Sequence, residues 1–102
     1  MDSNYIFKDV DENTKLQVWL KGKIIFQNGK EFDPHIWRKD VLGNVMKYSE
    51  HGNINSVHGW EIDHIIPKSK GGSDEISNLQ PLQWMDNRKK GDIIPAVSND
   101  NL

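Results

Sequence analysis

The sequence contains no cysteine. This absence excludes disulfide bonds, thiol catalysis and zinc sites built from thiolates, and it favours a reducing compartment. No apolar run approaches the roughly 18 residues that a membrane span needs, and the acidic residues 1–14 lack the apolar segment of a signal peptide. We therefore expect a cytoplasmic protein that makes no membrane contact.

The chain also carries little net charge, formally −2 at pH 7. This value alone argues against a nucleic-acid-binding protein, but the charges are unevenly placed. Residues 1–14 hold four carboxylates and one lysine, residues 15–50 hold seven basic and four acidic side chains, and Arg88, Lys89 and Lys90 are consecutive. We expect any nucleic-acid affinity to come from local patches and to depend on salt.

The composition is typical of one small globular domain. With 102 residues, 35% of them apolar, the chain is too short for two domains and buries a modest core. Four Trp, three Phe and two Tyr argue against a wholly disordered chain. We expect a single domain over residues 15–94, an acidic and mobile N-terminal segment (1–14) and a C-terminal tail (95–102).

The first half of this domain is expected to contain two hairpins. In each, β-branched and aromatic residues flank a short turn that contains glycine. The predicted strands cover residues 16–20 and 23–26, then 36–41 and 44–48. A helix over residues 36–48 is the competing interpretation of the second pair. Asn28-Gly29 predicts a further turn.

The second half predicts a strand, a long loop, a second strand and a helix. Apolar and polar residues alternate over residues 59–66, which predicts a strand that ends at a proline. Residues 68–77 have the composition of a loop. A second strand is expected over residues 78–83, followed by a helix over residues 84–90 that Gly91 ends.

Asp63 and His64 stand near the end of the first of these strands. Neighbours on a strand point to opposite faces, but the backbone at a strand end can twist enough to bring both side chains to one cleft. Histidine accepts a proton from water near neutral pH, and aspartate supplies the hard oxygen ligand that Mg²⁺ prefers. Alone, such a dipeptide is more often structural or simply exposed.

Three downstream features favour a catalytic role for the pair. Asn87 lies on the predicted helix, where its amide oxygen is a candidate second metal ligand. Asn78 begins the second strand, where its hydrogen bonds are expected to fix the loop and the His64 imidazole. The basic residues 88–90 surround Asn87 with cations for substrate phosphates. Each residue alone fits a turn, a helix surface or a solvated charge, and their joint occurrence in this order favours the site.

These residues belong to the run GWEIDHIIPKSKGGSDEISNLQPLQWMDNRKKGD (residues 59–92), which resembles the HNH nuclease motif. Its signature positions are His64, Asn78 and Asn87, an H-N-N variant with asparagine in place of the final histidine. Residues 37–52 are similar to the segment that precedes the motif in many small stand-alone HNH proteins. The resemblance implies an α+β fold, in which small antiparallel strands and hairpins are followed by a ββα-metal motif.

The resemblance also implies a chemistry. Asp63 and Asn87 are expected to hold one divalent ion, with Mg²⁺ favoured and Mn²⁺ or another divalent ion as the alternative, while His64 deprotonates the attacking water. Asn78 is included in the catalytic set as an orienting residue. The products are 5′-phosphate and 3′-hydroxyl ends. Many relatives carry two CxxC pairs for a structural zinc, and without cysteine no such zinc is expected here.

Several cations are expected to contact substrate phosphates. They are Arg38 and Lys39 from the second hairpin, Lys68 from the loop, and the residues 88–90. Glu61 shares a strand face with Asp63, and we expect it to form a salt bridge with a basic residue such as Lys90.

The expected substrate is double-stranded DNA in a bacterial or phage-infected cell, cut either with low sequence specificity or with specificity that a partner supplies. A homodimer, or a phage or bacterial protein partner, is left open, because one HNH centre cuts one strand. Two alternatives also remain open. One is a non-catalytic DNA-binding module that keeps the ββα-metal motif, and the other is a metal-stabilised protein-interaction domain.

Overall fold

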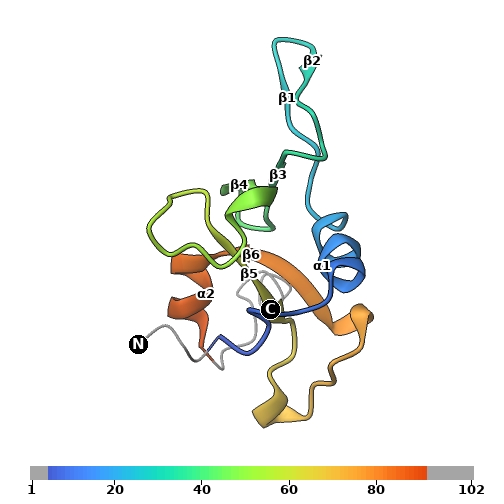
Figure 1. Cartoon of the computed structure of the whole chain (residues 1–102), viewed down its shortest axis with the longest axis vertical. Coiled ribbons are helices and arrows are strands. Elements are labelled where there is room, and N and C mark those ends of the chain that lie inside the picture. The colour runs from blue at the N-terminus through green and yellow to red at the C-terminus, as the bar shows by residue number, and fades with distance from the viewer. Residues whose placement is uncertain (1–4, 92–102) are drawn as a thin grey trace, which may run out of the picture.

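The structure is a computed structural model that describes residues 5–91, so the tail expected over residues 95–102 lies outside the described part (Figure 1). In chain order the helices and strands are α1 (Glu12–Trp19), β1 (Phe26–Gln27), β2 (Lys30–Glu31), β3 (Trp37–Lys39), β4 (Val45–Lys47), β5 (Trp60–His64), β6 (Leu79–Gln83) and α2 (Trp84–Lys90). Short 3₁₀ turns lie at Tyr48–Glu50 (η2), Lys68–Lys70 (η3) and Ile76–Asn78 (η4).

The strands form three antiparallel pairs, each of consecutive strands, so the expected α+β class is confirmed. Neither of the described helices is long and apolar enough to cross a membrane.

Helix α1 replaces the strand predicted over residues 16–20. Asp11 caps its N-terminus, because the Asp11 carboxylate accepts a hydrogen bond from the Thr14 N–H at 3.0 Å and so satisfies one of the free donors of the first turn. Val18 and Trp19, at the other end of the helix, are completely buried. The prediction was wrong because it considered the apolar residues alone, whereas the capping residue that starts the helix lies upstream of them.

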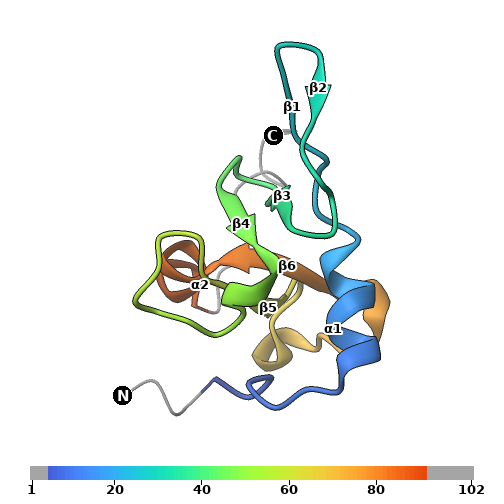
Figure 2. The ribbon, with the colours of Figure 1, turned by 45° about the horizontal axis from the view of Figure 1, so that its top comes forward.

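The first hairpin therefore forms later in the chain than predicted, between β1 and β2. Its turn is Asn28-Gly29, as expected, and the φ angles of 55° and 76° are those that a type I′ turn requires. Both strands are exposed, and the pair projects away from the rest of the molecule (Figures 1 and 2). The second predicted hairpin is confirmed as β3–β4, with Trp37 opposite Lys47, and the competing helix over residues 36–48 does not form.

The second half of the chain forms the expected strand, loop, strand and helix. β5 pairs with β6 so that His64 lies opposite Leu79, and β6 passes directly into α2. Gln83 makes this sharp joint, because its side-chain oxygen accepts hydrogen bonds of 2.9 and 3.2 Å from N–H groups in the first turn of the helix. The helix ends at Gly91, which has a φ of 52°. His64 is thereby held at one end of the strand pair, at the start of the long loop.

The core brings together residues from α1, β4, β5 and β6. Its buried members are Val18, Trp19, Met46, Trp60, Ile62 and Leu79. Tyr5, Phe7 and Val10 pack against this cluster, so the described residues 5–14 are part of the domain. The boundary predicted at residue 15 does not follow the packing, because the many acidic residues of this segment hid its apolar side chains.

His51 is a largely buried histidine whose pKa couples the fold to pH. Its Nε2 lies 2.8 Å from the Tyr5 hydroxyl. Burial, together with the nearby charge of Lys15, lowers the pKa of His51 to about 4 from the usual 6.5. Between these two pH values the unfolded chain binds a proton that the folded chain excludes. We expect the free energy of unfolding to fall by about 2 kcal/mol as the pH decreases through this window.

Urea unfolding at a series of pH values between 7.5 and 4 measures this effect, with His51→Gln as the comparison. The glutamine variant has no titrating ring, so its stability should fall less over the same range (about 2 kcal/mol less). The same pH dependence in both proteins would contradict the assignment to His51.

Candidate active site

Asp63, His64 and Asn87 line one open hollow on the surface. β5 contributes residues 61–64, α2 contributes Asn87 and Arg88, and residues 5–7 form the remaining wall. The predicted metal ligands and the predicted general base are thus brought to the same place, although they are far apart in the chain. Their neighbours determine what each side chain can do there.

The Asp63 carboxylate is buried, with 7% of the residue exposed, and each of its oxygens has a partner. Gln80 donates a hydrogen bond of 2.8 Å to Oδ2, and the Lys90 ammonium lies 3.1 Å from Oδ1. Burial raises the pKa of Asp63 above its ordinary value, while Gln80 and Lys90 oppose this rise because they favour the charged carboxylate.

The Asn87 amide is oriented by a buried carboxylate on the neighbouring strand. Its Nδ2 donates to Glu61 Oε1 at 2.7 Å. Glu61 is 1% exposed and is paired with Arg88, whose Nη2 lies 2.6 Å from Oε2 and whose Nε lies 3.1 Å from Oε1. The salt bridge expected for Glu61 is therefore present, but its partner is Arg88, whereas Lys90 pairs with Asp63. Within residues 5–91 the amide oxygen of Asn87 accepts no hydrogen bond.

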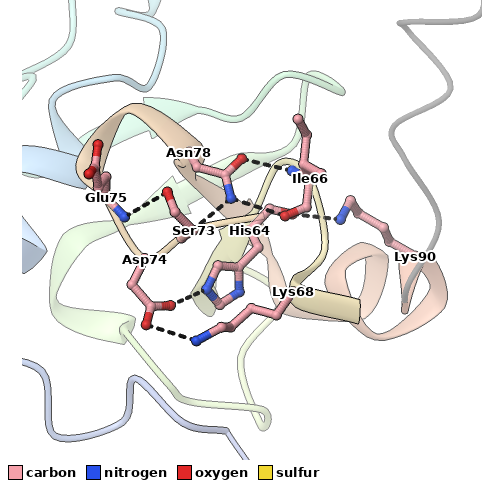
Figure 3. Close-up of polar contacts among 8 residues, drawn as sticks. All are labelled: His64, Ile66, Lys68, Ser73, Asp74, Glu75, Asn78 and Lys90. Atoms are coloured by element: carbon pink, nitrogen blue, oxygen red, sulfur yellow. Dashed lines mark hydrogen bonds and ion pairs between the residues drawn. The ribbon is translucent and has the colours of Figure 1, made fainter. Parts of the chain in front are cut away.

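His64 is held between an aromatic ring and a carboxylate. Its Nε2 lies 2.7 Å from Asp74 Oδ1, and the Lys68 ammonium lies 3.0 Å from the other oxygen of the same carboxylate (Figure 3). These two hydrogen bonds lower the pKa of Asp74 below its usual value. The ring of Phe7 lies 5.3 Å from the imidazole, measured between centroids.

Asn78 ties together the two ends of the loop that carries Asp74. Its Oδ1 accepts a hydrogen bond of 2.9 Å from the Ile66 N–H, and its Nδ2 donates to the Ile66 carbonyl at 3.0 Å and to the Ser73 carbonyl at 2.8 Å (Figure 3). The side chain does not touch the imidazole. Any effect of Asn78 on His64 is therefore exerted through the loop.

The donor set of the hollow suits a hard divalent cation. No group of three or more His, Asp or Glu side chains in the described range 5–91 is placed to hold a metal. The protein ligands would therefore be a carboxylate oxygen of Asp63 and the amide oxygen of Asn87. Oxygen atoms are the ligands that Mg²⁺ prefers, and this ion is commonly bound through only one or two protein groups together with water and phosphate. The residues thus fit such an ion.

Comparison with family models bears directly on this segment. Residues 49–92 match the model of the HNH endonucleases. This segment is therefore similar to the HNH domains, in agreement with the resemblance noted from the sequence. Neither the search of curated proteins nor that of solved structures found a match. HNH domains are nucleases or DNA-binding modules, and HNH nucleases generally use a divalent metal.

Two of the cations expected to contact phosphate are engaged inside the protein. Arg38 is only 8% exposed, and its guanidinium donates to the backbone carbonyls of Leu20, Gly22 and Pro34. Its predicted contact with DNA does not fit this burial. The Lys90 side chain is 8% exposed and donates to the His64 carbonyl at 2.9 Å besides pairing with Asp63.

The other expected cations are more accessible. Lys89 is exposed on α2, and Lys68 is exposed although it pairs with Asp74. Lys39 is half-buried on β3. Arg88 is partly exposed and lies against Glu61 at the hollow. A contact with phosphate remains a prediction for these four residues.

The sequence interpretation missed two residues of the candidate site. Asp74 lies ten positions after His64 in a polar loop, and nothing in the sequence indicates that the loop folds back onto the imidazole. Tyr5 lines the hollow and accepts a hydrogen bond of 2.5 Å from the Ile62 N–H. The aromatic residues at positions 5 and 7 were the available indication that this acidic segment packs against the domain.

Proposed function

We propose that the protein is a metal-dependent endonuclease that hydrolyses phosphodiester bonds of double-stranded DNA. The observation that carries the proposal is the shared hollow, in which a proton acceptor, His64, lies beside two oxygen ligands, Asp63 and Asn87. A nuclease needs a base to activate water and positive charge to stabilise the reacting phosphate. The HNH match over residues 49–92 supports this assignment.

In the proposed reaction, His64 takes a proton from a water molecule as the water oxygen attacks phosphorus. The bond between phosphorus and the 3′ oxygen breaks, and this oxygen acquires a proton from solvent, which gives 5′-phosphate and 3′-hydroxyl ends. A divalent ion, with Mg²⁺ favoured over Mn²⁺, would supply positive charge at the phosphate when bound. Asp63 and Asn87 would hold this ion, and Glu61 keeps the Asn87 amide oriented by accepting its N–H.

The DNA backbone would be bound by the accessible cations near the hollow and on β3. These are Lys89, Lys68, Lys39 and the partly exposed Arg88. Phosphate contacts of this kind carry no sequence information. We therefore propose cleavage with little sequence preference in a bacterial or phage-infected cell. One centre of this kind nicks one strand, so a double-strand break would require a homodimer, a protein partner or two successive nicks.

Nicking of supercoiled plasmid tests this proposal. The wild-type protein is incubated with Mg²⁺, with Mn²⁺ and with a chelator, next to Asn87→Ala and the control Asn55→Ala. Asn55 is an exposed asparagine that lies outside the hollow, whereas Asn87 is half-buried in it. We expect nicking that depends on the metal, is unchanged in Asn55→Ala and is at least about tenfold slower in Asn87→Ala, because loss of even an outer-shell partner of a metal ligand typically costs 10- to 100-fold in metal affinity or activity.

Binding of a labelled duplex in the same buffers separates the nuclease from the non-catalytic module. If the protein binds the duplex but does not nick DNA under any metal condition, the result would favour a non-catalytic DNA-binding module that keeps the ββα-metal motif. Nicking that persists in the chelator would contradict a metal-dependent reaction.

A further inference from the structure

The loop between η3 and η4 returns to the end of β5 and places a carboxylate on His64. Asp74 Oδ1 lies 2.7 Å from Nε2 of the imidazole, and Asp74 Oδ2 lies 3.0 Å from the Lys68 ammonium (Figure 3). None of the expected metal or phosphate contacts involves Asp74. Its position therefore calls for an explanation of its own.

The path of the loop is closely constrained, so the fold itself determines the contact between Asp74 and His64. Asn78 binds both backbone groups of Ile66 and also the carbonyl of Ser73, the residue just before Asp74. The backbone at Gly72 lies very close to Ile66. A Cβ at position 72 would lie 1.7 Å from the Ile66 carbonyl oxygen and 2.8 Å from Asn78 Nδ2. The loop thus requires a glycine at 72 and the Asn78 amide to carry Asp74 to the imidazole.

The contact also determines which ring nitrogen is the base. A neutral imidazole has one N–H donor and one acceptor nitrogen, and an ionised carboxylate only accepts hydrogen bonds. The proton must therefore be on Nε2, which leaves Nδ1 with a free lone pair. No hydrogen bond to Nδ1 occurs among residues 5–91.

We propose that Asp74 is a positioning residue that holds His64 in its Nε2–H tautomer, so that Nδ1 is the nitrogen that takes the proton from water. This inference rests on the proposed nuclease function for its chemistry. The tautomer itself can be measured without DNA or metal. A hydrogen bond made by one ring nitrogen fixes the tautomer and the orientation in which the other nitrogen acts.

Asp74→Asn is a sharp test because Lys68 determines how the new amide is oriented. The ammonium has only donors, so the amide oxygen should face Lys68 and the NH₂ group should face Nε2. A donor at this place favours the opposite tautomer, with the proton on Nδ1. Glu75→Gln is the matched control, since it is the same change in charge on the next, exposed residue.

The experiment combines long-range ¹H–¹⁵N spectra of histidine-labelled protein with plasmid nicking. Spectra are recorded at pH 8.5, where the free imidazole is neutral, and His64→Ala identifies the His64 signals among the four histidines. We expect the Nε2–H tautomer in wild type and Glu75→Gln, and a shift toward Nδ1–H in Asp74→Asn. The kcat of Asp74→Asn should fall about 100-fold with KM unchanged, within the range for loss of a general base.

Two results would overturn the proposal: a wild-type His64 that carries its proton on Nδ1, or an Asp74→Asn variant that nicks at the wild-type rate. Failure of the nuclease function gives a different result. In that case the wild-type spectrum shows the Nε2–H tautomer, which supports the role of Asp74 in placing the proton on Nε2, but neither the wild type nor any variant nicks DNA. Thermal melting checks that Asp74→Asn is folded, which we expect because the Asp74 side chain is 59% exposed.

Discussion

Replacing His64 with alanine should lower the rate of plasmid nicking by about 10²- to 10⁴-fold, the usual contribution of a general base. DNA binding should be nearly unchanged, because the imidazole carries no phosphate contact in the proposed arrangement. Stability should also change little. The ring makes one hydrogen bond at Nε2, to an exposed carboxylate, and packs on Phe7 at the edge of the domain.

His35→Ala is the matched control for this variant. His35 is also a histidine, but its side chain is 80% exposed and lies in the turn before β3. Rates are compared under single-turnover conditions at saturating protein, and duplex affinity is measured in parallel. Equal nicking by His64→Ala and wild type would show that another group activates the water, while a loss in both variants would indicate a contaminating or indirect effect.

The largest effect on stability is expected for Asp40→Ala. Asp40 is 1% exposed and connects the β3–β4 hairpin to the start of α2. Its oxygens accept hydrogen bonds from the N–H groups of Leu42 (3.0 Å), Asn44 (2.8 Å) and Gln83 (2.9 Å), and from the side-chain amide of Asn44 (3.0 Å). Alanine leaves these donors without an acceptor. We expect a loss of about 3 kcal/mol in the free energy of unfolding.

For a domain of this size, such a loss lowers Tm by roughly 12–20 °C, which calorimetry detects directly. Asp9→Ala is the control, since Asp9 is an exposed aspartate, and its Tm should stay within a few degrees of wild type. Asp40→Asn should be nearly as harmful as Asp40→Ala, because the amide would point a donor at groups that are themselves donors. Full stability of the asparagine variant would show that the carboxylate is not the acceptor that these N–H groups need.

The local parts of the fold were predictable because the information lies in neighbouring residues. Asn28-Gly29 indicates its turn through the positive φ that these residues tolerate, and Gly91 indicates the end of α2. The order of Asp63, His64 and Asn87 predicted that these side chains lie close together, and all three line one hollow. Helix α1 was also accessible from the sequence, through the capping residue Asp11, but the β-branched and aromatic residues within positions 16–20 obscured it.

The partners of the charged residues were not predictable, because they depend on tertiary packing. The sequence shows Arg38 as a cation in a basic region. Only the fold shows that three backbone carbonyls surround its guanidinium. Likewise, Lys90 belongs to a basic trio in the sequence, but the pairing of α2 with β5 turns its ammonium toward Asp63. Such contacts between segments distant in the chain have no local sequence pattern.

The N-terminal wall of the hollow has a consequence for how the protein should be divided or tagged. The family match begins at residue 49, yet Tyr5 and Phe7 line the hollow and pack against the core. A fragment cut at the family boundary would lose one side of its own cleft together with Trp19, the indole that lies 5.1 Å from Trp60. The smallest unit for expression therefore begins ahead of Tyr5. An affinity tag joined directly ahead of Tyr5 would stand beside the hollow that DNA enters in the proposed reaction.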